Sequence, residues 1–156
     1  MAALAALSLG RAIEMDHLMV TDPRYQAEEW MAANLRPGTR VEVYQKAAFL
    51  PRFRDGVSAE FVPIARRTRA ALLERRPDAI VTSSASHLSI THIWAPDWRE
   101  TRTLHTPAPA AVDLLNALET GALPYRIEAI FRQEPRLLRN RITSVAPEIV
   151  VYVRSE

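Results

Sequence analysis

Residues 21–44, TDPRYQAEEWMAANLRPGTRVEVY, contain the start of a helix, its end and the start of a strand. Thr21 or Asp22 can cap the helix, because either side chain can accept a hydrogen bond from the free backbone N–H groups of a first turn. Pro23 follows in that first turn, where its missing N–H donor is tolerated. The stretch therefore predicts a helix with a defined start.

The same stretch also stops the helix and leads directly into a strand. In NLRPG, Pro37 cannot continue a helix, and Gly38 turns freely because it has no side chain. Residues 40–45, RVEVYQ, then alternate apolar and polar residues with the two-residue period of a strand. A helix joined closely to a strand is the building unit of α/β folds.

Similar units recur along the rest of the chain. The expected elements are a helix from Ser58 or Ala59 to Arg76, a strand over 79–86, a helix over 110–120 capped by Gly121, and strands over 125–133 and 149–155. Helices that alternate with strands imply parallel crossovers, whereas no clear helix separates the last two strands. We therefore expect one α/β domain over residues 21–156. It would be a small, mostly parallel sheet of about four strands with flanking helices, its last strand antiparallel and at an edge.

Residues 1–20 form a separate apolar segment ahead of this domain. The run is interrupted by Arg11 and Glu14, so it is shorter than the ~20 apolar residues that span a bilayer. It has no basic region and no clear cleavage site, which argues against a signal peptide. Two interpretations stay open: the remnant of a membrane helix, or an Ala/Leu amphipathic helix that is frayed or docked on the domain.

The composition is that of an ordinary globular protein with a basic segment. The 156 residues include no cysteine and carry a formal net charge of +2, so disulfides and thiolate metal sites are excluded. Residues 65–76, ARRTRAALLERR, hold five arginines against one glutamate. This segment either attracts phosphate or an anionic membrane surface or forms a solvated helix face. No nucleic-acid-binding motif is present, so we expect no nucleic-acid partner.

Candidate ligand-binding residues gather where the strand over 79–86 ends. Ser83 and Ser84 follow its buried part, His87 is adjacent, and Gln45 stands at the end of the first strand. Ligands bind beyond the carboxyl ends of strands in open α/β sheets, and a serine beside a base is a potential nucleophile. The glycines of a nucleophile elbow are missing, however, so the serines are equally explained as hydroxyls that satisfy backbone groups. We predict ligand-binding candidates here but no catalytic residue.

The histidines do not form a recognisable metal motif. The candidates are His87, His92 and His105 with Asp97. Their spacing does not match the three- or four-residue spacing of ligands on a helix face. We therefore predict neither a metal site nor a cofactor.

Four motifs follow one another in a characteristic order. They are an aspartate–arginine helix with a tryptophan and a proline–glycine turn, a DAIVTSS strand, a phenylalanine strand, and a closing P-x-I-x-V-Y strand. The matching residues are Asp22, Arg24, Ala27, Trp30, Asn34, Pro37, Gly38, residues 78–84, Phe131, Pro147, Ile149, Val151 and Tyr152. The order resembles the soluble C-terminal portion of bacterial membrane glycosyltransferases of the dolichyl-phosphate-mannose–protein mannosyltransferase and aminoarabinose transferase type. The resemblance covers roughly residues 15–154, and the DAIVTSS strand lacks the tyrosine that is usual in that family.

The resemblance implies a non-catalytic accessory domain. In that family the catalytic acidic residue lies in the first extracytoplasmic loop between early membrane helices, and no segment of this chain resembles that loop. The partner would be the membrane part of a glycosyltransferase that uses a lipid-phosphate-linked sugar, or the membrane surface, on the extracytoplasmic (periplasmic) side of the inner membrane. Two alternatives remain: a free-standing hydrolase-like enzyme with a site near Ser83–His87, and an interaction module that uses residues 65–76. The oligomeric state stays open.

Overall fold

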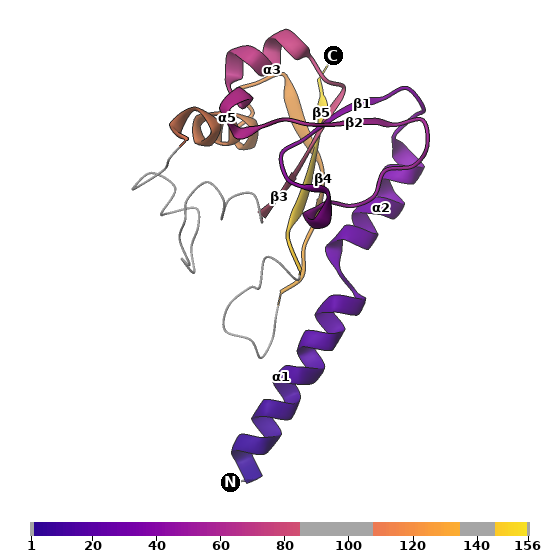
Figure 1. Cartoon of the computed structure of the whole chain (residues 1–156), viewed down its shortest axis with the longest axis vertical. Helices are drawn as coiled ribbons and strands as arrows, with labels where there is room; N and C mark the ends of the chain where they lie inside the picture. Colours follow the sequence, from indigo (N-terminus) through magenta and orange to yellow (C-terminus); the bar gives the residue numbers. More distant parts are fainter. Residues whose placement is uncertain (1, 85–107, 135–145, 156) are drawn as a thin grey trace.

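The computed structural model describes residues 2–84, 108–134 and 146–155, with side chains from residue 6 onward. The described strands form one five-stranded sheet in the order β2-β1-β3-β5-β4 (Figure 1). Their bounds are β1 Arg40–Val43, β2 Ser58–Phe61, β3 Ala79–Ser83, β4 Tyr125–Phe131 and β5 Ile149–Arg154. The predicted α/β class is confirmed, with five strands instead of about four.

Strand directions follow the prediction for most of the sheet. β1 pairs in parallel with β2 and with β3, whereas β5 pairs antiparallel with both β3 and β4. The last strand is therefore the antiparallel member, as expected. Its predicted place at an edge is wrong, because β5 lies between β3 and β4. Val151 and Tyr152 are both buried, so β5 is covered on both faces, whereas β4 exposes Arg126 and Glu128 as an edge strand does.

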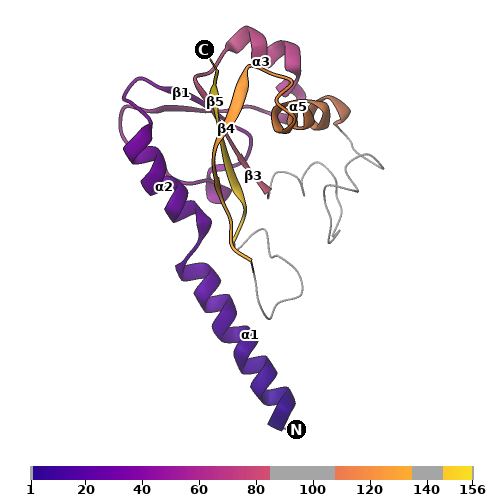
Figure 2. The ribbon, with the colours of Figure 1, turned by 180° about the vertical axis from the view of Figure 1, so that it is seen from behind.

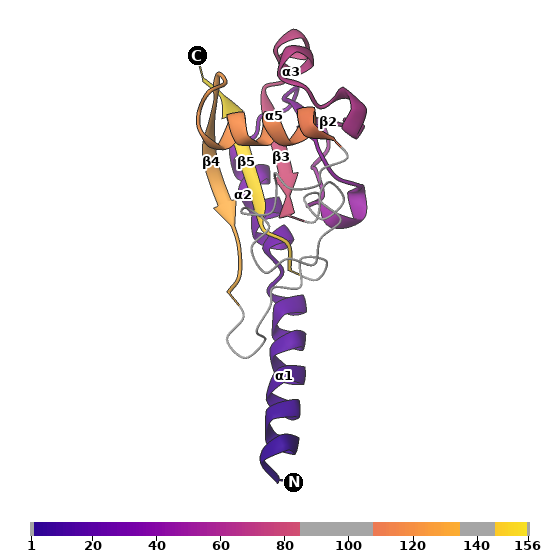
Figure 3. The same cartoon turned by 90° about the vertical axis from the view of Figure 1, so that its left-hand side faces the viewer.

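Helices cover both faces of the sheet. Helix α2 (Pro23–Asn34) packs on one face through buried Ala27 and Met31, which join Val41 and Val151 in one core cluster. Helices α3 (Arg69–Arg75) and α5 (Pro109–Glu119) cover the other face. Figure 3 shows α5 in front of the strands and α2 behind them. The fold therefore has three layers, helix–sheet–helix.

The predicted ends of α2 and α5 are confirmed by their capping contacts. Asp22 is the N-cap of α2, and its carboxylate accepts a hydrogen bond from the Arg24 backbone N–H at 2.8 Å. At the end of α5, Gly121 has a φ of +69°, which a glycine adopts without strain. The Gly121 N–H donates to the Leu118 carbonyl and the Ala122 N–H donates to the Ala117 carbonyl, which is a Schellman motif.

The predicted helix over residues 58–76 is wrong in its first half. Strand β2 occupies the start of this range, a 3-10 helix follows at Ile64–Arg66, and α3 begins only at Arg69. The residue before a proline disfavours helical geometry, so Pro63 keeps Val62 extended. The Val62 N–H donates to the Val43 carbonyl and continues the pairing of β2 with β1. Thr68 then caps α3 by accepting from the Ala71 N–H at 3.1 Å.

Helix α1 (Ala2–Val20) stands apart from this three-layer body. In Figures 1 and 2 it extends away from the sheet, and only its C-terminal end approaches the other elements. Leu18, near that end, is 5% exposed, whereas Leu9, Ile13 and Val20 are more than half exposed. Leu9, Ile13 and Val20 of α1 therefore lack the packing that stabilises α2.

Candidate functional site

The predicted serines lie at the carboxyl ends of the parallel strands, as the sequence indicated. β1 and β3 are neighbours, and their register places Val43 level with Val81, so Gln45 and Ser83 follow on the same edge of the sheet. Ser83, Ser84 and Gln45 are all largely buried. The fourth candidate, His87, lies outside the described residues.

Contacts within the fold engage the polar groups of Ser84 and Gln45. The Ser84 hydroxyl oxygen accepts from the Glu148 N–H at 2.9 Å, and the Ser84 N–H donates to the Glu148 carbonyl at 2.9 Å. The Gln45 side-chain oxygen accepts from the Lys46 N–H at 2.8 Å. Ser84 thus joins the end of β3 to the start of β5, and Gln45 closes the end of β1. This geometry favours the interpretation that these side chains satisfy backbone groups.

Most arginines of residues 65–76 do not form a free basic surface. Arg75 is bound to Glu42, Arg69 is paired with Asp113 at 2.5 Å, and Arg67 is buried. α3 is also only seven residues long. In this segment only Arg66 and Arg76 are exposed without a described ion pair, so the solvated basic face consists of these two side chains.

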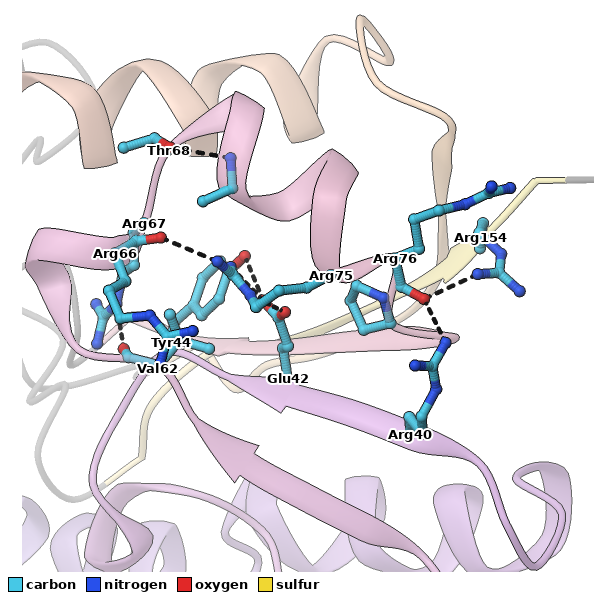
Figure 4. A network of polar contacts seen from close by, with 12 residues as sticks. Arg40, Glu42, Tyr44, Val62, Arg66, Arg67, Thr68, Arg75, Arg76 and Arg154 are labelled. Atoms are coloured by element: carbon cyan, nitrogen blue, oxygen red, sulfur yellow. Dashed lines mark hydrogen bonds and ion pairs between the residues drawn. The ribbon is translucent and has the colours of Figure 1, made fainter.

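A buried polar network lies beneath α3, on strand β1 between β2 and β3 (Figure 4). Two nitrogens of one guanidinium donate to one carboxylate here: Arg75 Nε donates to Glu42 Oε1 at 2.5 Å, and Arg75 Nη2 donates to Glu42 Oε2 at 3.0 Å. The Tyr44 hydroxyl donates to Glu42 Oε2 at 3.2 Å. Bidentate, charge-assisted bonds of this kind are among the strong hydrogen bonds of proteins. The network fixes α3 on the sheet.

The pKa values of this network follow from its burial and pairing. Burial, and then the Glu42 charge, raise the pKa of Tyr44 well above its usual range. The hydrogen bond to Glu42 raises the pKa of Arg75. Tyr44 is therefore neutral and Arg75 charged at neutral pH. Neither is poised to exchange a proton, so the network reads as structural and not as a general acid–base pair.

The sequence did not predict this network. Glu42 alternates with Val41 and Val43, which in a half-buried strand would place it in solvent. β1 instead lies inside a sheet covered on both faces, so Glu42 is 4% exposed. The available signal was the surplus of arginine in residues 65–76, because buried carboxylates need cationic partners.

A second polar cluster lies at the amino-terminal ends of the parallel strands β1 and β3, opposite to the serines. Arg76 is the C-cap of α3 with a φ of +48°, and its carbonyl accepts from Arg40 Nη2 and from Arg154 Nη1, both at 2.8 Å (Figure 4). Asp78 accepts from the Arg40 N–H at 2.9 Å and from Arg154 Nη2 at 3.0 Å. These cations satisfy the last carbonyl of α3 and stabilise its helix dipole.

An open groove of about 280 Å³ lies near this end of the sheet, between α2 and the strands β4 and β5. Its lining includes Trp30, Asn34, Arg126 and Glu128. The Asn34 amide donates to the Trp30 carbonyl at 2.8 Å, and Arg126 is paired with Glu128 at 2.8 Å. Several of its polar groups are thus engaged with each other, and the groove is smaller than most ligand pockets.

Residues 2–84, 108–134 and 146–155 hold neither a metal-binding group nor a helix suited to cross a membrane. Among those residues, no three or more His, Cys, Asp or Glu side chains gather as a metal-binding group. The histidine set of the sequence, with Asp97, falls outside them. No helix of the described part has the length and apolar character needed to cross a bilayer.

Comparisons with known proteins identify no relative. No family model matches the chain, and neither a curated protein nor a solved structure matches it.

Proposed function

We propose that this chain is a non-catalytic accessory domain of a membrane-embedded glycosyltransferase that uses a lipid-phosphate-linked sugar. It would lie on the extracytoplasmic side of the membrane. The observation that carries the proposal is helix α1, whose apolar side chains are exposed on different sides of the helix. The order of motifs from Asp22 to Tyr152 supplies the link to glycosyltransferases.

The exposed apolar residues of α1 favour contact with lipid over contact with a protein groove. Residues two apart on a helix point about 200° apart around its axis, and Leu7 and Leu9 are 43% and 63% exposed. A helix that is apolar all round is suited to a uniformly apolar environment, whereas a protein groove needs one apolar face. No charged residue occurs before Arg11, and Glu14 and Asp16 follow it. The uncharged first half of α1 would therefore lie in the lipid surface beside the membrane part, and the charged second half would face water.

The three-layer body supports a non-catalytic role. Ser84 and Gln45 are engaged with backbone groups, and the Glu42–Arg75–Tyr44 network is paired internally. The Ser84 hydroxyl oxygen is engaged with the Glu148 N–H, a backbone group and not the base that activates a nucleophile. A rigid body joined to an apolar helix is suited to holding a membrane enzyme or its substrate in place.

The proposal is tested by recovering the tagged full chain from membranes of its native host in mild detergent. We expect co-purification of an activity that transfers sugar from a polyprenyl-phosphate donor. The matched control is Leu7→Glu/Leu9→Glu/Ile13→Glu, which leaves the three-layer body intact and should recover no such activity. Recovery of the wild-type chain from membranes without any sugar transfer would contradict the proposal.

The hydrolase alternative is separated by a different measurement. Purified wild-type protein is assayed against ester substrates beside Ser84→Ala. We expect no turnover by either protein. Turnover by the wild type that Ser84→Ala abolishes would instead establish the serine as a nucleophile.

A further inference from the structure

Arg67 is a buried arginine whose environment differs from that of the other arginines described above. Its residue is only 4% exposed, although it stands in a connection between a 3-10 helix and α3. Its Nε donates to the Val62 carbonyl at 2.8 Å (Figure 4). Its guanidinium carbon lies 5.2 Å from the centre of the Tyr44 ring and 5.7 Å from that of Phe61. One backbone contact and two rings thus fix the guanidinium in position.

No carboxylate of the described residues pairs with Arg67. The nearest network already uses Glu42, whose two oxygens are bound by Arg75 and Tyr44. Within the described residues the Arg67 side chain donates a hydrogen bond to a protein group only through Nε, and its Nη1 and Nη2 are not fully buried. A buried cation normally has an anionic partner, because cation–π contacts replace only part of the lost hydration.

The charge of Arg67 persists despite its burial. Burial lowers the pKa of Arg67 to about 10, so the guanidinium remains protonated at neutral pH. The preceding residue, Arg66, is exposed and adds a second positive charge. This part of the molecule therefore carries two adjacent positive charges, and two N–H groups of one of them are open to a ligand.

We propose that Arg67 anchors a binding site for a phosphate group. The two terminal nitrogens of a guanidinium match two oxygens of an oxyanion in a bidentate contact. The choice of phosphate over carboxylate rests on the proposed function, in which the substrate is a lipid-phosphate-linked sugar. The site then recognises the phosphate or pyrophosphate group of that substrate class, with Arg67 as its binding residue and the rings of Tyr44 and Phe61 as its support.

The test measures the thermal midpoint of the full chain with and without inorganic pyrophosphate. Three proteins are compared: wild type, Arg67→Met, and Arg66→Met as a control that removes an adjacent exposed charge. We expect pyrophosphate to raise the midpoint of wild type and Arg66→Met and to leave Arg67→Met unchanged. Without ligand, Arg67→Met should unfold at or above the wild-type midpoint, because it removes an unpaired buried charge.

A second variant and a second anion make the test specific. Arg67→Lys keeps the charge but loses the fork, so we expect about tenfold weaker pyrophosphate binding with the fold retained. Citrate replaces pyrophosphate in a parallel titration, and an equal response to citrate would overturn the assignment to phosphate. The proposal also fails if pyrophosphate does not change the thermal midpoint of the wild type while Arg67→Met has a much lower midpoint than the wild type. Arg67 would then have a structural role within its own chain.

Vesicles distinguish a lipid phosphate from a free one. In wild type, vesicles that contain polyprenyl phosphate should compete with pyrophosphate more strongly than vesicles without it. Equal competition by the two vesicle types would show that the site takes the free anion, and would overturn its assignment to a lipid-linked substrate. These results are independent of the co-purification through α1, so failure of the phosphate site and failure of the proposed function are distinguishable.

Discussion

Two consecutive helices of this protein, α1 and α2, use their apolar residues in opposite ways. α2 places Ala27 and Met31 against the sheet, where they are 0% and 3% exposed. In α1, Met19 and Val20 are 48% and 75% exposed. α2 is therefore stabilised by its contacts with the sheet, whereas Met19 and Val20 of α1 make no comparable contacts. The difference separates a helix that belongs to the core from one whose apolar side chains stay exposed.

The largest effect on stability is expected inside the three-layer body, from Arg75→Met. The change leaves the Glu42 carboxylate buried without its cation, and breaking such a pair lowers the free energy of unfolding by about 3 to 5 kcal/mol. Chemical denaturation measures the loss, with Arg66→Met as the control that removes an exposed charge. The double variant Glu42→Met/Arg75→Met should recover much of the stability; a double variant no better than Arg75→Met would contradict the account of this pair.

The next effect compares the same substitution in the two helices. Met31→Ala removes a buried side chain from the core of α2 and should lower the free energy of unfolding by about 3 kcal/mol. Met19→Ala makes the same chemical change on the exposed surface of α1 and should alter it by less than about 0.5 kcal/mol. Equal losses in the two variants, measured by urea unfolding, would show that α1 is packed on the body as α2 is.

A smaller effect is expected from Tyr44→Phe, which removes the hydroxyl that donates to Glu42. The loss should be about 1 kcal/mol at neutral pH. The raised pKa of Tyr44 gives the sign of its pH dependence: its stabilising contribution is present below the unfolded pKa of about 10 and declines as pH rises above it. The stability difference between wild type and Tyr44→Phe should therefore shrink above pH ~10. A difference that grows there would contradict the assignment of a neutral, hydrogen-bonded tyrosine.

The smallest effect on stability is expected from Leu7→Glu/Leu9→Glu/Ile13→Glu in α1. All three side chains are exposed, so the free energy of unfolding of the body should change by less than about 0.5 kcal/mol. Circular dichroism and urea unfolding check this expectation. A large loss of stability would mean that α1 belongs to the folded core.

The sequence predicted those elements whose boundaries depend on local chemistry. Asp22 and Gly121 were identified as helix ends because a capping side chain and a glycine act within one or two residues of themselves. β5 was identified as a strand by its run of β-branched residues. Its position inside the sheet was missed, because strand order depends on which faces the helices cover.

The errors and omissions have the same physical origin. The range of residues 58–76 looked helical by spacing, yet Pro63 and the exposed edge of β1 make its start a strand. The Glu42–Arg75 pair joins residues 33 positions apart, so the alternation around Glu42 could not reveal it, and the surplus of arginine in residues 65–76 was the one signal. Ser83, Ser84 and Gln45 were correctly placed at the carboxyl edge of the sheet, and a ligand-binding role for them stays a prediction.

The most direct test of the central claim is flotation of the full chain with vesicles of anionic phospholipid. The wild type should float with the vesicles, because the apolar first half of α1 enters the lipid surface. The Leu7→Glu/Leu9→Glu/Ile13→Glu variant should stay at the bottom of the gradient while it keeps the wild-type unfolding midpoint. Equal flotation of both proteins, or a wild type that remains at the bottom, would contradict the account.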